Sequence, residues 1–249
     1  MRQYWKLILA GIIAYGLFVI ITTPAVWWLR MLPVPAAVQF GQVSGSLWQG
    51  QIRQLQIQQV PFSDLRWQLN PWSLLMLRAD ITVTAGAIHQ ENQPYLSAHI
   101  QLKPTEIRVT NGLLKLPVAT LLPLLQLPVP VQATGELVLD INQLQVKDQV
   151  CASLIGNASW LDAKLQPPVG SWLDLQHFHA NLSCENQQPV LITDPANILA
   201  LDVRATVNAA GKLQVSGTLK PAAELPAEVH QAMQFVGAPD AEGRYRLNF

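Results

Sequence analysis

The sequence predicts a mainly β protein that carries one transmembrane helix at its N-terminus. The first observation is a run of 23 residues, Leu7–Leu29, that contains no charged residue. The second is the alternation of apolar and polar residues along most of the remaining chain, which is typical of β-strands with one buried face. The third is an apolar stretch at 116–127 that is interrupted by proline, so only a short helix is expected there.

The uncharged run is long enough to cross a lipid bilayer. A helix rises about 1.5 Å per residue, so roughly 20 residues cross the hydrocarbon core. Trp27 and Trp28 lie at the far end of the run, and aromatic side chains of this kind prefer the level of the lipid headgroups. We therefore predict a transmembrane helix over residues 7–29.

The flanking charges predict the orientation of this helix. Arg2, Lys6 and the terminal amine precede it, whereas only Arg30 closely follows it. Positive residues favour the cytoplasmic side, so residues 1–6 are expected to form a cytoplasmic tip and the bulk of the chain to lie outside the cytoplasm. A cleaved signal peptide and a buried core helix are the alternatives. A signal peptide usually has an apolar region of about 7–15 residues and a small-x-small cleavage site, which residues 22–27 do not resemble.

The composition argues against nucleic acid as a partner. Charged residues make up 13% of the chain, and the 25 glutamines outnumber the 16 lysines and arginines. Thirteen of the basic residues and all 16 acidic residues follow Arg30, which gives this part a net charge of −3. The charges are scattered, and no basic patch is present that could release counterions from a phosphate backbone.

Two cysteines, Cys151 and Cys184, lie in the part of the chain expected outside the cytoplasm. A small, even number of cysteines in an exported domain favours a disulfide between them. Two buried free thiols are the alternative. A zinc site is disfavoured, because two cysteines supply only half of a tetrahedral site and no histidine pair has a zinc-finger spacing.

Two prolines make the segment that follows the helix stiff and extended, so residues 30–38 are expected to form a short linker. A β domain over residues 39–249 follows. A weak similarity between the stretches that begin at Gly45 and Gly135 suggests two β halves, although any Leu- and Gln-rich strands would look alike. The halves and the short helix between them are predicted at 39–115, 116–127 and 131–249.

Alternation places the strands, and small polar residues place the turns. Asn111-Gly112 predicts a tight hairpin turn. The last residues, 245–249, predict a final strand with a terminal aromatic residue. A strand of this kind also closes outer-membrane barrels, but the long uncharged run at the N-terminus argues against that interpretation. The clearest strands are expected around Leu65–Leu69, Ile81–Ala87, Leu96–Leu102, Leu137–Ile141, Leu199–Val207 and Leu213–Leu219.

No set of residues in the sequence predicts catalysis. His177 and His179 are two residues apart in an alternating stretch and share a face, but no carboxylate or third histidine has a spacing that would complete a metal site. Acidic residues occur singly, so no general acid/base pair can be nominated. Nucleophile elbows, phosphate-binding Gly-rich loops and Cys-x-x-Cys pairs are absent from the sequence. We therefore expect no catalytic residue, no bound cofactor and no metal.

A run with two flanking glycines carries the most specific pattern in the chain. Its residues are Val43, Gly45, Leu47, Trp48 and Gly50. On physical grounds alone, Trp48 is a core aromatic residue between two turns. However, this run resembles a pattern in the N component of bacterial type II secretion systems. Four further features share that resemblance: the N-terminal run, the Leu116-Pro117-Val118-Ala119 segment, Gly135, and the two cysteines that bracket Gly156-x-Ala158-x-Trp160.

The resemblance covers essentially the whole chain and implies both a fold and a role. Members of that family are inner-membrane proteins with a large periplasmic domain. The implied fold is a curved, mostly antiparallel sheet, similar to the elongated β-grooves of envelope lipid-transport proteins. The implied role is non-catalytic: an accessory part of the machinery that exports folded proteins, which acts by contact with other secretion components. A periplasmic groove that handles lipid or lipopolysaccharide is the second hypothesis, and a periplasmic enzyme is the third and least favoured.

Overall fold

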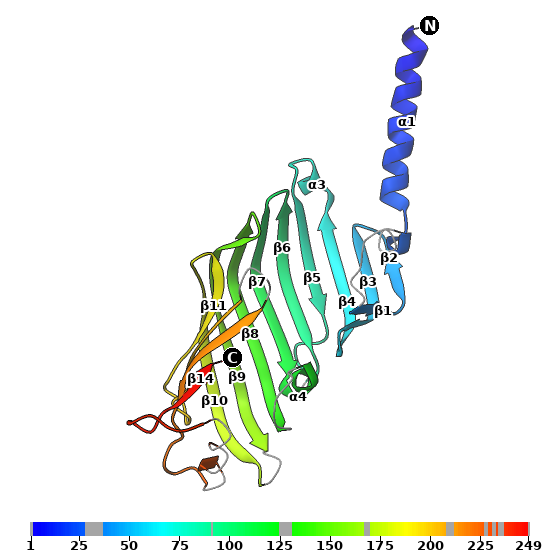
Figure 1. Ribbon diagram of the computed structural model, residues 1–249. Coiled ribbons are helices and arrows are strands. Elements are labelled where there is room, and N and C mark those ends of the chain that lie inside the picture. Colours follow the sequence, from blue (N-terminus) through cyan, green and yellow to red (C-terminus); the bar gives the residue numbers. More distant parts are fainter. Residues whose placement is uncertain are drawn as a thin grey trace.

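One large antiparallel sheet makes up most of the molecule (Figure 1). The computed structural model describes residues 2–27, 37–90, 92–124, 131–166, 170–207, 212–226, 229–230, 233 and 237–248. Within these residues the sheet has 14 strands, ordered β1-β3-β4 and onward in sequence to β14, with β2 paired to β3 beside β1. Every strand pair is antiparallel, as the alternation predicts.

The strands lengthen toward the middle of the sheet and shorten at its ends. The first half consists of β1 (Val38–Phe40), β2 (Val43–Gly45), β3 (Gln49–Ile57), β4 (Val60–Asn70), β5 (Ala79–Ala85), β6 (Tyr95–Lys103) and β7 (Glu106–Pro117). The second half consists of β8 (Gln132–Lys147), β9 (Val150–Gln166), β10 (Leu173–Glu185), β11 (Gln188–Thr193), β12 (Asp202–Val207), β13 (Leu213–Leu219) and β14 (Tyr245–Asn248).

The helices in the described part of the chain are mostly short and include α1 (Arg2–Thr22), α3 (Pro71–Leu74), α4 (Val118–Leu121) and the 3-10 turn η1 (Leu122–Leu124). Helix α1 overlaps the predicted transmembrane helix from Leu7 to Thr22. Among the residues that the structure describes, no helix meets the length and apolarity expected of a membrane span. The placement of α1 in a membrane therefore stays a prediction, and most of the predicted linker at 30–38 lies outside the described residues.

The two predicted halves share a single sheet. β7 pairs with β8 along almost its whole length, from Glu106 opposite Lys147 to Pro117 opposite Glu136. The predicted helix between the halves is reduced to α4 and η1, in keeping with the proline at position 123, and residues 125–130 lie outside the described part of the chain. The internal repeat stays a prediction.

The predicted hairpin turn at Asn111-Gly112 is wrong. Asn111 has a φ of 50°, and both residues lie inside β7, where the pairing with β6 shifts by one residue. Asn111 thus forms a bulge that bends a continuous strand. An Asn-Gly pair favours positive φ in either setting, and only the pairing of the neighbouring strands distinguishes a bulge from a turn. The predicted final strand is present as β14, which pairs with β13.

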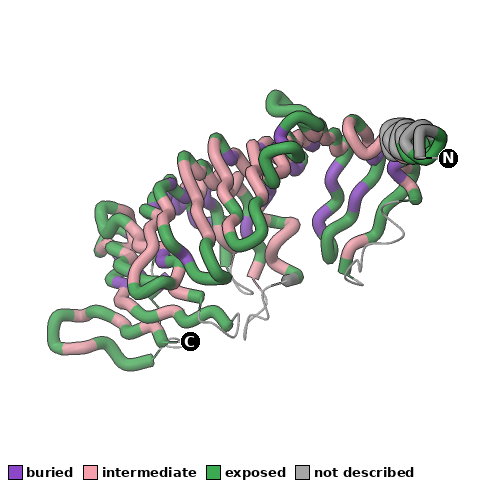
Figure 2. Tube along the Cα trace, turned by 90° about the horizontal axis from the view of Figure 1, so that it is seen from above, coloured by how far each residue is buried: buried purple, intermediate pink, exposed green. Residues whose placement is uncertain are grey.

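The sheet bends along its length into an arc (Figure 2). In Figure 1 the C-terminal strands, orange and red, turn toward the viewer in front of β9 and β10, on the same side as α4. Leu121 of α4 packs against a buried cluster that contains Leu116. The concave face of the sheet is therefore its apolar face, and the convex face carries the polar side chains.

The buried core consists of two clusters on this concave face, both toward the strand ends at which α4 lies. One cluster consists of Ile52, Leu55, Val60, Phe62, Ala85 and Leu116. The other consists of Ala163, Leu173, Leu175, Phe178, Leu225 and Val229, so part of it comes from the segment after β13. Toward the opposite ends of the strands, on the side of α3, the apolar side chains of the concave face are less buried, and this part of the face is the candidate functional site.

Candidate functional site

Rows of apolar side chains cross the concave face on the side of the strand ends near α3. The pairing of successive strands places one such row on six neighbouring strands, β4 to β9: Leu69, Ile81, Ile100, Val109, Leu144 and Leu154. A second row continues over β8 to β13: Ile141, Gly156, Leu182, Leu191, Ala205 and Val215. These two sets are called the apolar rows below.

The side chains of the apolar rows are only half-buried. None of them belongs to either buried cluster, and every one except Gly156 keeps a part of its surface accessible. A soluble protein ordinarily covers contiguous apolar surface of this extent, and where it is left open it marks a site of interaction. The apolar rows are therefore the leading candidate for a binding surface.

A concavity of about 510 Å³ lies over the part of these rows that β8, β9, β10 and β11 contribute. Its walls are mainly apolar and include Ile141, Leu144, Leu154 and Leu182. The amide side chains of the β10–β11 turn, among them Gln187, form its rim. An apolar floor with amides at the edge suits an uncharged, largely apolar ligand or the apolar side chains of a partner protein.

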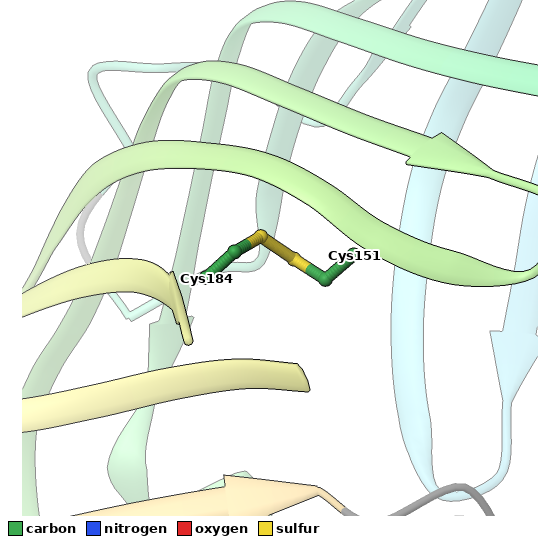
Figure 3. Close-up of a disulfide and its surroundings, with 2 residues drawn as sticks. All are labelled: Cys151 and Cys184. Carbon is green, nitrogen blue, oxygen red and sulfur yellow. A yellow bond between two sulfur atoms is a disulfide. The ribbon is translucent and has the colours of Figure 1, made fainter. Parts of the chain in front are cut away.

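The predicted disulfide between Cys151 and Cys184 is present and borders this concavity (Figure 3). The regular pairing of β9 with β10 ends where Gly156 lies opposite Leu182, before either cysteine is reached. The disulfide joins the two strands beyond that point, with the Cα atoms 5.8 Å apart. The backbone N–H of Cys151 also donates to the carbonyl of Gln187 at 3.0 Å. The wall of the concavity is thereby fixed to the β10–β11 turn.

The glycine-flanked run forms a hairpin that connects the N-terminal helical segment to the sheet, and this connection is called the joint below. Val43, Gly45 and Gly50 lie in the β2–β3 hairpin, with Leu47 and Trp48 at its turn. Gly45 has a φ of 95°, a conformation that favours glycine. A Cβ on Gly50 would overlap the indole ring of Trp67. These contacts explain both glycines without assigning them a ligand.

Two residues that sequence reasoning missed complete this joint. The indole N–H of Trp67 in β4 donates to the carbonyl of Leu47 at 3.1 Å, which holds the turn against the neighbouring strand. On the other side of the turn, Pro24 forms an isolated β-bridge with Ser46. The hairpin therefore connects the end of the N-terminal helical segment to the sheet. Neither contact leaves a local sequence signal, because each joins residues about 20 positions apart.

The two histidines considered as metal ligands lie exposed on β10, where local hydrogen bonds engage them. Nδ1 of His177 accepts from the backbone N–H of Asp162 at 3.1 Å, and Nδ1 of His179 lies 2.9 Å from the hydroxyl of Ser159. Within the described ranges no group of three or more His, Cys, Asp or Glu side chains is arranged to hold a metal ion.

Charged groups gather on the convex face away from the apolar rows. Glu106 accepts hydrogen bonds from Lys103 at 3.0 Å, from Arg108 at 2.9 Å and from Gln145 at 3.0 Å. The hydrogen bond from Lys103 is the main reason that the pKa of Glu106 lies below its usual value. At the far end of the sheet, the backbone N–H of Arg244 lowers the pKa of Asp240. These pairs stabilise turns and strand ends and face solvent.

Fold and site together define a class of protein: an open antiparallel sheet whose concave apolar face is half-covered. The family model described as type II secretion system (T2SS), protein N, matches residues 36–248. This match covers most of the sequence. The chain therefore belongs to the type II secretion system protein N family, as the sequence motifs indicated.

Individual relatives agree with the family match. The type II secretion system protein N of Aeromonas hydrophila is 30% identical over 100% of this chain and 98% of its own length. The protein of the same name from Vibrio cholerae is 28% identical over 92% of this chain and 91% of its own. That of Pectobacterium carotovorum is 26% identical over 96% of this chain and 94% of its own. No solved structure matches the chain.

Proposed function

We propose that this protein is an accessory, structural component of a bacterial type II secretion system that is anchored in the inner membrane. It acts in the periplasm by contact with other secretion components and carries out no chemical reaction. The assignment to a type II secretion system rests on membership of the family. The half-buried apolar rows are the observation that carries the remainder of the proposal, because an open apolar face is suited to binding rather than to catalysis.

The anchor is proposed from the uncharged run and from the surroundings of α1. Ile8, Ile12 and Phe18 are exposed on this helix, with no part of the described protein packed over them. Apolar side chains in this setting are stable in lipid and unfavourable in water. The cationic residues before the run favour a cytoplasmic N-terminus and a periplasmic sheet. The disulfide is consistent with that oxidising compartment.

The ends of the sheet offer a second means of contact. The strand order ends at β14, so within the described part of the chain the outer edge of this four-residue strand has no partner strand. β13 extends past β14 at Leu213–Val215, which adds further unpaired backbone. Free strand edges can pair with an extended segment of another protein.

Affinity purification from native membranes tests the proposal. The tagged full-length protein is extracted in mild detergent, and co-purifying proteins are quantified by mass spectrometry against an unrelated single-pass periplasmic protein of similar abundance. We expect enrichment of other type II secretion components. Recovery of the protein without any of them, from cells that are actively secreting, would contradict the proposed role.

A second candidate function is the handling of lipid or lipopolysaccharide in the concave face. The concavity of about 510 Å³, with its apolar floor and amide rim, favours it. Acyl chains would lie along the apolar rows, and the low charge of the chain suits such a ligand.

Lipid analysis distinguishes this candidate. The full-length protein is purified in a lipid-free detergent, and bound phospholipid and lipopolysaccharide are extracted and quantified. If the concave face holds lipid, Leu144→Gln lowers the bound amount, whereas Gln143→Ala on the opposite face of the same strand leaves it unchanged. Equal, sub-stoichiometric lipid in all three proteins excludes this candidate and leaves the first proposal intact.

A further inference from the structure

The β4–β5 connection exposes an unusual concentration of large apolar side chains. Over residues 71–77, Trp72, Leu75, Met76 and Leu77 are between 69% and 81% exposed, and Leu74 is 40% exposed. This segment is called the apolar loop below. An isolated exposed leucine needs no explanation, but five large apolar side chains within six residues form a surface that water does not favour.

The apolar loop is held in this shape by polar contacts on its inner side. The side chain of Asn70 accepts from the backbone N–H of Trp72 at 3.1 Å, which caps the short helix α3. Ser73 is buried; its hydroxyl donates to the carbonyl of Asn70 at 2.6 Å and accepts from the N–H of Asp80 at 3.1 Å. The backbone is thus anchored to the sheet through Ser73, and the apolar side chains around it point away from the protein.

Leu77 adds a second observation. Its φ is 54°, and its N–H donates to the carbonyl of Leu74 at 3.0 Å while the N–H of Arg78 donates to Ser73 at 3.3 Å. This pair of bonds ends a helix with one residue in the left-handed conformation, a position that glycine usually occupies. A leucine there costs stability, and because its side chain is 81% exposed, packing within the protein does not offset that cost.

The apolar loop lies at the upper ends of the strands in Figure 1, on the side of the sheet from which the N-terminal helix extends. A short series of contacts connects the two. Pro24, two residues after α1, forms a β-bridge with Ser46. Trp48, at the same turn, accepts at its carbonyl from the N–H of Leu69 at 2.7 Å, and Asn70 then caps α3. The end of α1 and the apolar loop are therefore connected through one hairpin turn.

We propose that the apolar loop inserts into the periplasmic interface of the inner membrane as a second membrane contact beside α1. This inference rests on the proposed membrane anchor. Leucine, methionine and tryptophan are the side chains that enter the boundary between headgroups and acyl chains, typically to a depth of about 5–10 Å. The bilayer is favoured over a protein partner because the anchor brings the bilayer surface to this side of the sheet.

A second contact would fix the direction in which the sheet leaves the membrane. A sheet tethered by a single helix is free to rotate about that tether, whereas two neighbouring contacts define a plane. The arc would then project its concave face in one direction into the periplasm, so that the apolar rows meet their ligand or partner with a defined orientation.

Depth-dependent fluorescence quenching tests this proposal on the full-length protein in phospholipid vesicles. The two native cysteines form the disulfide, so a single introduced cysteine can be labelled with an environment-sensitive fluorophore. Leu75→Cys reports on the apolar loop. Gln90→Cys, in the connection at the opposite end of β5, is the matched control. Ile12→Cys reports separately on the proposed anchor. Each labelled protein is measured with lipids that carry a spin label near the headgroup or near the bilayer centre.

If the loop inserts, the probe at position 75 shows blue-shifted emission and loses most of its intensity with the shallow spin label, whereas the probe at position 90 is not quenched. A quenched probe at position 12 with an unquenched probe at position 75 overturns the loop proposal and leaves the anchor standing. An unquenched probe at position 12 overturns the anchor itself. Blue-shifted emission at position 75 without quenching indicates burial against protein and also overturns the proposal.

Discussion

Among single residues, Gly50 occupies a position that leaves no room for a side chain. Its Cα lies beneath the indole of Trp67, and a Cβ at this position would overlap the ring. The same indole holds the β2–β3 turn through its bond to the carbonyl of Leu47. The glycine-flanked run is therefore explained by the close approach of a tryptophan from the neighbouring strand.

Gly50→Ala should destabilise the protein. The added methyl group forces the Trp67 ring or the β3 backbone to move, and overpacking of this kind typically costs about 1–3 kcal/mol. Urea unfolding followed by tryptophan fluorescence measures the change. Gln49→Ala, one residue earlier, is the control, with an expected effect within about 0.5 kcal/mol of zero. Equal midpoints for the two variants would show that the contact with Trp67 does not constrain position 50.

The pKa of Glu106 provides a test of the convex face. Hydrogen bonds from Lys103 and Arg108 stabilise its ionised form, so the pKa is lower in the folded than in the unfolded protein. The contribution of this carboxylate to stability is therefore present above the unfolded pKa and is lost as the pH falls through the folded pKa. Carbon-detected NMR titration should show the depressed pKa, and Lys103→Gln should raise it toward the ordinary value. An unchanged pKa in that variant would refute the assignment.

Among the elements, β9 and β10 are linked by the disulfide beyond the point at which their regular pairing ends. Cys151 and Cys184 are 33 positions apart, and their bond joins β9 to β10 beyond the last regular pair. In the chain-entropy description, closing a loop of this length stabilises the folded state by roughly 3–4 kcal/mol. The concavity beside it depends on the same two strands.

Replacement of both cysteines by alanine should lower the free energy of unfolding by about that amount, roughly 3–4 kcal/mol. The change is measured by urea unfolding under non-reducing conditions. Wild-type protein in reducing buffer is the parallel sample and should approach the behaviour of the double variant. A double variant as stable as the oxidised wild type would show that the disulfide does not contribute to the stability of the fold.

The strands illustrate what the sequence predicts and what it leaves open. Alternation identified β5, β6 and β13 because one face of each is polar and the other apolar. It misplaced Asn111-Gly112 as a turn, since a bulge and a turn use the same backbone conformation. Contacts between strands, such as Trp67 over Gly50, could not be predicted, because they depend on the register of the pairing and on a side chain 17 positions away.

At the scale of the whole molecule, the two predicted halves join into one arc rather than two packed units. Alternation predicts that a strand has an apolar face, but it contains no information about what covers that face. The sequence therefore could not indicate that the apolar rows are half-exposed while the two buried clusters lie toward the strand ends on the side of α4. This uncovered part of the concave face, on a sheet attached to an N-terminal helix, leads to the proposal of function by contact.

Photo-crosslinking in living cells tests whether the concave face is the surface that binds a partner or a ligand. A photoreactive amino acid is placed at Leu154, on the concave face, or at Ile155, which is the next residue of β9, lies on the convex face and is 55% exposed. We expect discrete adducts from position 154, with a secretion component or with lipid, and none above background from position 155. An absence of adducts at position 154, or equal adducts at both positions, would contradict the claim that the concave face is the working surface.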